Sequence, residues 1–408
     1  MAPMRSRLVA PVIVALTVAA CNAGVSSNLP LTAAVPSTQN ASIPHWKANG
    51  EATQVCPNVP PGYVHCDLLL MGKKSGPDVA GYGPADLQAA YNLPSSTNGA
   101  GQIVAVVDPF DNPNAASDLA AYRKEFNLGK AKFVKYNEKG EKGNYPKACP
   151  SSFAGWCLED DLDIEMVAAV CPKCTTYLIE ANLYNSRSLE RAESTAVRLG
   201  AHIVSNSWGC AGLNPCLDAR HFNKPGVLYV ASAGDYGFGT QEPASLASVV
   251  SAGGTILHKS GSSYRETVWP DTGVGCASGF TKPSWQHDPS CPYRTMNDVA
   301  AVARDVAEYD TFRPYKGWFT VMGTSISTPL LAGVFALAGN AGTVNAGENF
   351  WTLKKKALKN DLHAITSGSV SGCPVSLQGS YICEAGTKQY RDYSAPAGWG
   401  TPDGTNAF

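Results

Sequence analysis

Apolar and polar positions follow two alternating periods from residue 82 onward. Short apolar runs alternate with segments that have helical periodicity. The helical segments are Ala116–Phe126, Cys157–Val170, Ser188–Leu199 and the apolar run after Ser325. Buried strands separated by helices predict an α/β fold with a mostly parallel central sheet and helices on both faces. Active-site residues of such sheets collect at strand ends and helix starts. The predicted strands are Gln102–Val107, Thr175–Glu180, His202–Ser207, Val227–Ala231 and Ser248–Ala252.

The predicted helix around residues 157–170 is unusually acidic. Glu159 and Asp163 are four residues apart, so their carboxyls lie side by side on one face. Two adjacent carboxylates ionise together reluctantly, and the carboxylate with a raised pKa can act as a general base in acid. Asp161 and Glu165 have the same spacing, and a charge run is most often a solvated face. Periodicity alone therefore leaves the choice of pair open.

A candidate nucleophile precedes a second apolar helix. Gly323-Thr324-Ser325 leads into the run Pro329–Ala338, which predicts a buried helix with Pro329 in its first turn. A serine at this position faces unpaired backbone donors and the positive helix end, which favour an alkoxide. A helix-start serine is more often only a cap. Seven histidines occur, and none stands in a Gly-Thr-rich helix start, which opposes an ordinary subtilisin mechanism.

Several segments in order resemble the sedolisins, which are serine-carboxyl peptidases with a subtilisin-like fold. The resemblance covers about residues 82–402. It rests on Glu159-x-x-Leu162-Asp163-Ile164, Ser232-Ala233-Gly234-Asp235-Tyr236-Gly237 and Gly323-Thr324-Ser325-x-x-x-Pro329, with Val204–Gly209, Glu266–Trp269 and Lys282–Gln286 in between.

The resemblance implies a role for each motif residue. Ser325 is the expected nucleophile, Glu159 its general base and Asp163 the group that orients Glu159, while Asp235 stabilises the oxyanion. Only this resemblance selects Glu159 with Asp163. Asp108, at the end of a predicted strand, stands where a subtilisin places its triad aspartate. Without a suitable histidine it has nothing to orient, so we interpret it as structural.

The N-terminal region predicts export. Arg5 and Arg7 precede the apolar run Leu8–Val18, so residues 1–20 are expected to be a signal peptide. Cys21 follows in a sequence that resembles a bacterial lipoprotein processing site. We expect an extracellular or membrane-surface-tethered protein, with lipid-modified Cys21 or, alternatively, free secretion. Residues 21–81 are expected to form a polar tether and a short N-terminal prosegment, too short for the large prodomain common in sedolisins, and residues 82–408 the peptidase domain.

The cysteine count predicts disulfides. Setting aside Cys21, twelve of the thirteen cysteines remain, an even number that suits an oxidising compartment. For Cys171-x-x-Cys174, a structural disulfide is favoured over a redox centre or a metal site. Sequence does not fix the connectivity, but the cysteines fall as neighbours: Cys56 and Cys66, Cys149 and Cys157, Cys171 and Cys174, Cys210 and Cys216, Cys276 and Cys291, Cys373 and Cys383.

The calcium site of sedolisins is expected to be lost. By the resemblance, Ala364 and Ser394 stand where the two ligand aspartates are expected, and without carboxylates the hard cation is poorly held. Asp361, Asp392 and Asp403 lie close in sequence and offer an altered site, although loop aspartates are more often turn residues. We therefore expect no metal or other cofactor.

The combined prediction is an exported serine-carboxyl endopeptidase of disulfide-stapled α/β fold. It would cleave peptides or proteins through an acyl-enzyme on Ser325, best in acid. A net charge of −1 without a basic stripe gives no reason to expect nucleic acid. The alternative is an inactive surface protein that uses the peptidase fold as a binding scaffold. All predicted catalytic positions hold competent residues, which favours the enzyme.

Overall fold

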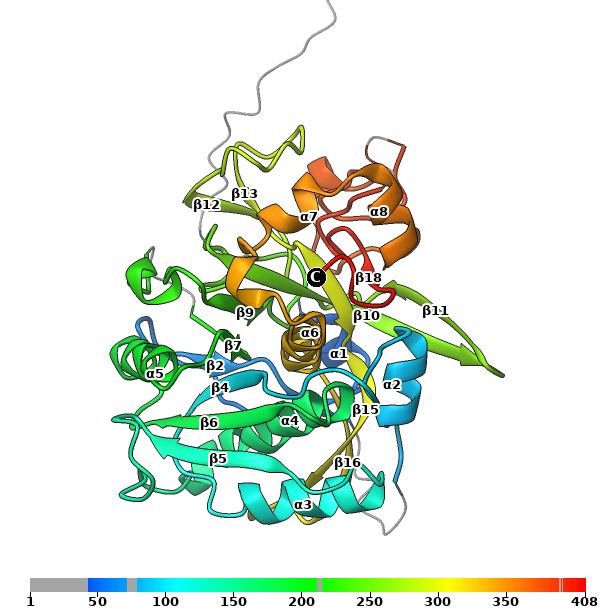
Figure 1. Cartoon of the computed structure of the whole chain (residues 1–408). Helices are drawn as coiled ribbons and strands as arrows, with labels where there is room; N and C mark the ends of the chain where they lie inside the picture. Colours follow the sequence, from blue (N-terminus) through cyan, green and yellow to red (C-terminus); the bar gives the residue numbers. More distant parts are fainter. Residues whose placement is uncertain (1–42, 72–78, 211–214, 389, 391) are drawn as a thin grey trace, which may run out of the picture. The chain divides into compact units, whose positions relative to one another are not determined.

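A mostly parallel sheet forms the centre of the fold (Figure 1), in the strand order β11-β10-β9-β7-β4-β6-β5, with β14 paired to β10. Its pairs are parallel except for the antiparallel pair of β10 and β11. The strands are β4 (Ile103–Pro109), β5 (Lys132–Asn137), β6 (Thr175–Ala181), β7 (Ile203–Asn206), β9 (Leu228–Ser232), β10 (Val249–Ser260), β11 (Ser263–Val268) and β14 (Val299–Val302).

The computed structural model describes residues 43–71, 79–210, 215–388, 390 and 392–408. The predicted signal peptide, Cys21 and the tether up to residue 42 lie outside the described residues. No helix within the described ranges is long and apolar enough to cross a membrane.

The helices match the predicted periodic segments within a few residues, and the predicted strands recur, β10 being much longer than expected. The helix α4 contacts α2, α3 and α6, and α4 and α6 also pack against the sheet, while α5 packs on β4 and β6. The predicted fold class is therefore confirmed. The helices are α1 (His45–Ala48), α2 (Pro84–Ala90), α3 (Ala115–Glu125), α4 (Gly155–Val170), α5 (Ser186–Arg198), α6 (Thr324–Ala338), α7 (Glu348–Thr352) and α8 (Lys355–Asp361).

An antiparallel sheet brings residues near the N-terminus to the strand that precedes Ser325. Its order is β1 (Thr53–Gln54), β3 (Leu69–Met71), β16 (Gly317–Met322) and β15 (Arg304–Asp310). Three smaller pairs are β2 (His65–Cys66) with β8 (Trp208–Gly209), β12 (Cys276–Thr281) with β13 (Tyr293–Thr295), and β17 (Leu362–His363) with β18 (Thr401–Pro402).

The acidic helix α4 is buried along its whole length, including every carboxylate on it. The charge run on α4 is therefore not a solvated face, which was one of the alternatives that periodicity left open. The reason is packing: α2, α3, α6 and β15 surround α4 together with the sheet, so no face of it reaches solvent. Burial of unpaired carboxylates is costly and favours their neutral forms.

The helix after the nucleophile motif begins earlier than predicted. Because α6 starts at Thr324, Pro329 lies inside the helix and not in its first turn. Proline has no N–H to donate to the carbonyl of the residue four positions earlier, which is Ser325. The hydroxyl of Ser207 lies 3.4 Å from that carbonyl oxygen, and it also lies 2.6 Å from Asp163 Oδ1.

All six neighbouring cysteine pairs form disulfides, so the nearest-neighbour pairing is confirmed. Cys171–Cys174 closes the C-terminal end of α4 as a structural bond. The other bonds are Cys56–Cys66, Cys149–Cys157, Cys210–Cys216, Cys276–Cys291 and Cys373–Cys383.

Candidate active site

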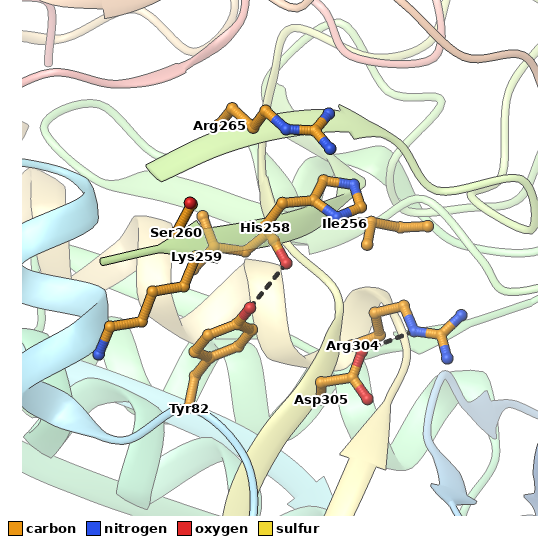
Figure 2. Close-up of a pocket in the computed structure, with 9 residues that line it drawn as sticks. Tyr82, Ile256, His258, Lys259, Ser260, Arg265, Arg304 and Asp305 are labelled. Atoms are coloured by element: carbon orange, nitrogen blue, oxygen red, sulfur yellow. Dashed lines mark hydrogen bonds and ion pairs between the residues drawn. The ribbon is translucent and has the colours of Figure 1, made fainter. Parts of the chain in front are cut away.

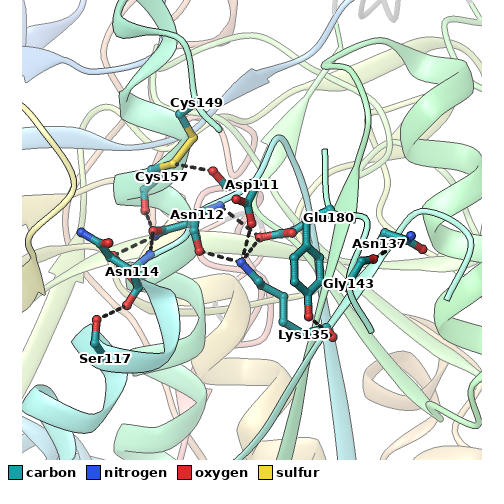
Figure 3. A network of polar contacts seen from close by, with 12 residues as sticks. Asp111, Asn112, Asn114, Ser117, Lys135, Asn137, Gly143, Cys149, Cys157 and Glu180 are labelled. Carbon is teal, nitrogen blue, oxygen red and sulfur yellow. Dashed lines mark hydrogen bonds and ion pairs between the residues drawn. A yellow bond between two sulfur atoms is a disulfide. The ribbon is translucent and has the colours of Figure 1, made fainter. Parts of the chain in front are cut away.

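A polar network fixes the first turn of α4 against the sheet (Figure 3). Asn112, which follows β4, donates from its side-chain amide to the Cys157 carbonyl at 2.9 Å. The same amide of Asn112 donates to Asp161 Oδ2 at 2.9 Å. Its own N–H donates to Glu180 Oε1 at 3.0 Å, and Lys135 Nζ donates to its carbonyl at 2.9 Å. These bonds join β4, β5 and β6 to the turn of α4 that carries Glu159, so they hold that residue in place.

Ser325 lies in the first turn of α6, opposite α4. Its hydroxyl lies 3.3 Å from the carbonyl oxygen of Ser207, just beyond β7. Among the described residues, neither oxygen of the buried Glu159 carboxyl has a hydrogen bond of good geometry. As a neighbouring hydrogen-bonding group, the Ser325 hydroxyl lowers the pKa of that carboxyl. The structure thus brings the predicted nucleophile and the predicted base together.

Electrostatics around Glu159 favour a shared proton. Burial raises the pKa of Glu159 well above its ordinary value, and the carboxyls of Asp163 and Asp108 raise it further. Burial also raises the pKa of Asp163 well above its ordinary value, with Asp108 next in effect, whereas Glu159 and Ser207 lower it as hydrogen-bonding groups. Asp108, which we interpreted as structural, therefore raises the pKa of both members of the predicted pair. Burial raises the pKa of Asp108 itself to about 8.

The rival pair on α4 faces a different part of the molecule. Asp161 lies near Asp118 and Asp310, and Glu165 Oε2 accepts the N–H of Tyr309 at 3.1 Å. Asp118 belongs to α3, and Tyr309 and Asp310 belong to β15. None of them belongs to the turn that carries Ser325. Position therefore separates the two pairs, which periodicity alone did not.

Asp235 caps the helix that carries Ser325. Its Oδ1 accepts the N–H of Thr324 at 2.8 Å and the hydroxyl of the same residue at 3.0 Å. Its Oδ2 is buried without a hydrogen-bond partner among the described residues. Burial raises the pKa of Asp235 well above its ordinary value, and the Asp67 carboxylate raises it further. A neutral Asp235 has a proton that it can donate from Oδ2.

Sequence reasoning missed Asp67, whose carbonyl oxygen accepts the N–H of Ser325 at 3.1 Å. The Asp67 carbonyl oxygen and Asp235 Oδ2 both lie close to Gly323. A Cβ on Gly323 would lie 2.1 Å from the first oxygen and 2.7 Å from the second, and the φ of Gly323 is 139°. Glycine is therefore required at this turn. The available signal was the neighbouring pair Cys56 and Cys66, which predicted a disulfide close to Asp67 but did not indicate where this segment packs.

Carboxylates also cluster outside the serine site. The carboxylates of Asp118, Asp161 and Asp310 are buried and lie within 4.8 Å of one another, an arrangement that could hold a cation or share protons. At the two positions where the resemblance predicts calcium ligands, Ala364 follows β17 and the hydroxyl of Ser394 is buried without a partner among the described residues.

A surface pocket elsewhere has no catalytic constellation (Figure 2). It is lined by Tyr82, His258, Arg304 and Asp305 together with neighbours on β10 and β11. Tyr82 donates to the Leu257 carbonyl at 2.9 Å, and Arg304 pairs with Asp305 at 2.9 Å. These groups are occupied by structural contacts. The candidate site is therefore the one at Ser325. The chain's own Asp67 occupies it, since the Asp67 carbonyl accepts the Ser325 N–H.

Comparisons with known proteins support the predicted family and fold. The sequence profile of the subtilase family matches residues 151–358, about half of the chain. Kumamolisin from Bacillus sp. (strain MN-32) is 31% identical over 295 residues, which are 62% of this chain and 51% of kumamolisin. The chain thus spans about half the length of that relative.

Among solved structures, Pseudomonas sedolisin, a serine-carboxyl proteinase complexed with two molecules of pseudo-iodotyrostatin, has a similar fold. The TM-score is 0.62 at 20% identity, over 80% of this chain and 96% of the sedolisin chain. The predicted sedolisin-like, subtilisin-type fold is confirmed.

Proposed function

This chain belongs to the subtilase family, and on that premise we propose that it is an exported serine-carboxyl endopeptidase that hydrolyses peptide bonds in acid. The observation that carries the proposal is the convergence of three groups on one point. The N–H of Ser325 and the unpartnered oxygen of Asp235 lie at the turn around Gly323, and the Ser325 hydroxyl lowers the pKa of the buried Glu159 carboxyl as a hydrogen-bonding group.

The first chemical step uses Ser325 and Glu159. The Ser325 hydroxyl attacks the peptide carbonyl carbon and gives its proton to Glu159, which later passes a proton to the leaving amine. Asp163 holds the second carboxyl of the pair and keeps Glu159 oriented. Because burial and mutual repulsion raise both pKa values, the pair retains a shared proton under acidic conditions.

The oxyanion would be stabilised by two donors. The N–H of Ser325 already binds the Asp67 carbonyl oxygen, and both that oxygen and Asp235 Oδ2 lie against Gly323, 2.1 Å and 2.7 Å from where a Cβ would stand. A carboxylate would repel the oxyanion, so Asp235 must be neutral to act. This requirement supports acid-favoured activity.

A peptide library incubated with the purified protein across pH tests the proposal. The protein is first held at acidic pH, and Ser325→Ala serves as the matched control. We expect cleavage by the parent and none by the variant. Equal cleavage, or cleavage by neither, would instead favour the alternative of a binding scaffold.

We also propose that Cys21 is lipid-modified after export, which would hold the enzyme at a membrane surface. A lipid-bearing cysteine follows from the processing-site resemblance, and a polar segment after it suits a tether. Mass spectrometry of the mature N-terminus tests this, and an unmodified start downstream of Cys21 would mean free secretion.

A further inference from the structure

The segment Tyr63–Asp67 lies in the candidate active site as the middle strand of three. On one side, β2 pairs antiparallel with β8, with His65 opposite Gly209 and Cys66 opposite Trp208. On the other side, Tyr63 forms an antiparallel bridge with Asn185, and the Val64 N–H donates to the Tyr184 carbonyl at 2.9 Å. A peptide held along both edges has its backbone fixed before any chemistry occurs.

This pairing places one carbonyl at the nucleophile. The Asp67 N–H donates to the Ser207 carbonyl at 3.2 Å, the same oxygen that lies 3.3 Å from the Ser325 hydroxyl. The Asp67 carbonyl accepts the Ser325 N–H. The next residue, Leu68, is buried, and the chain then continues as β3 on β16. Asp67–Leu68 is therefore the peptide bond presented to Ser325.

The side chain of Asp67 enters a buried polar pocket. Its Oδ2 accepts the Ser232 hydroxyl at 2.5 Å and the Gln241 amide at 2.5 Å. The same amide donates to the Ser232 carbonyl at 3.0 Å, which fixes its orientation. Gly209 leaves the room that Gln241 needs, since a Cβ there would lie 2.1 Å from the Gln241 side chain. Both donors belong to the enzyme body and remain after the segment leaves.

A second, weaker neighbour of Asp67 comes from the segment itself. His65 Nε2 lies 3.6 Å from Asp67 Oδ1, and Oδ1 has no hydrogen-bond partner among the described residues. A substrate would not bring this histidine with it, so recognition depends on Ser232 and Gln241. A leucine side chain in this pocket would leave both donors unpaired, a loss of the kind that discriminates strongly between substrates.

We propose that this pocket selects aspartate as the residue whose carbonyl is attacked, and that the chain's own Asp67–Leu68 bond is the first bond cleaved. This inference rests on the proposed peptidase function. In the step, the Ser325 oxygen bonds to the Asp67 carbonyl carbon while its proton passes to Glu159. The bond to the Leu68 nitrogen breaks, and that nitrogen takes the proton. One water then hydrolyses the ester, which leaves Asp67 with a free carboxyl group and regenerates Ser325.

The disulfide Cys56–Cys66 lies wholly on the N-terminal side of this bond, so cleavage would leave no covalent link between the fragments. The fragment would still be held by contacts such as the Trp46 indole N–H to the Asp235 carbonyl at 2.9 Å. Release of these contacts would open the cleft to other peptides.

The test has two parts. First, the full chain is incubated in acid beside Ser325→Ala, and new N-termini are sequenced. We expect a terminus at Leu68 in the parent only. Second, processed protein is assayed on a pair of peptides that differ only in aspartate or leucine at the cleaved residue. We expect kcat/KM to favour aspartate by about tenfold or more, because the leucine peptide loses about one hydrogen-bonding interaction in the pocket.

The variants Gln241→Leu and Ser232→Ala should each reduce the preference for aspartate. If one of them does not fold, the other still tests the pocket. Gln286→Leu is the matched control: it also removes a buried amide, which donates to the Thr295 carbonyl, and should keep the preference. Equal or better cleavage of the leucine peptide, or a preference unchanged in both pocket variants, overturns the inference alone. Absence of any Ser325-dependent cleavage overturns the proposed function as well.

Discussion

The hydroxyl of Ser207 lies 2.6 Å from Asp163 Oδ1 and 3.4 Å from the carbonyl oxygen of Ser325. One side chain thus connects the second member of the carboxyl pair to the helix turn that carries the nucleophile. A protonated Asp163 can donate to Glu159 or to Ser207. If Asp163 orients Glu159, its replacement should reduce the rate more than it reduces stability.

Asp163→Asn should lower kcat by about two orders of magnitude while KM stays within a fewfold. The amide keeps the size of the side chain but cannot share a proton with Glu159. Ser207→Ala should have a smaller effect, because it removes only a positioning contact. Steady-state kinetics on one peptide measures both, and an Asp163→Asn enzyme as fast as the parent would contradict the role.

Glu159→Gln should lower kcat by about three orders of magnitude or more, since members of such a catalytic set act as a unit. Glu165→Gln is the matched control on the same helix. Its amide oxygen can still accept the Tyr309 N–H, so activity should stay close to that of the parent. A Glu159→Gln enzyme within about tenfold of the parent, roughly 1.4 kcal/mol, would refute the assignment.

These residues also show which features of the site could be predicted from the sequence and which could not. Periodicity predicts the strands and helices because each depends on local spacing, and the motif around Ser325 identifies the nucleophile. The burial of Asp161 and Glu165 was not predictable, since a polar helix face is assigned to solvent until its packing partners are known. Asp67 was not predictable either, because its place depends on pairing β2 and β3 with strands far along the chain.

Asp235→Asn should weaken the decline of kcat at higher pH. Burial raises the pKa of Asp235, so it is neutral and able to donate in acid and loses its proton as pH rises through its raised pKa. An asparagine amide donates at every pH. Profiles of kcat against pH for both enzymes check this, and a parent maximum above neutrality that the variant leaves unchanged would argue against the role.

Calcium should be unnecessary for stability. Ala364 and Ser394 offer no carboxylate where the family's ligands are expected, and the disulfide Cys373–Cys383 constrains the same C-terminal region instead. Melting with and without chelator should give the same Tm, and elemental analysis should find no calcium. One tightly held calcium per chain, with a large drop of Tm in chelator, would overturn this.

The folded chain should lose stability as pH rises. Burial raises the pKa of Asp108 to about 8 and that of Asp310 to about 8, the latter also through Asp118. In the unfolded chain these carboxyls titrate near pH ~4. Between these values the folded protein binds more protons than the unfolded one, so the free energy of unfolding falls as pH increases.

The Tm of the Ser325→Ala variant, which cannot digest itself, should be lower at pH ~8 than at pH ~5 by about 5 °C or more. Asp108→Asn in that background removes one titrating group and should flatten the dependence, because the amide stays neutral across this range. A Tm that rises toward neutral pH would show that these carboxyls are ionised and paired in the folded protein, contrary to the burial described above.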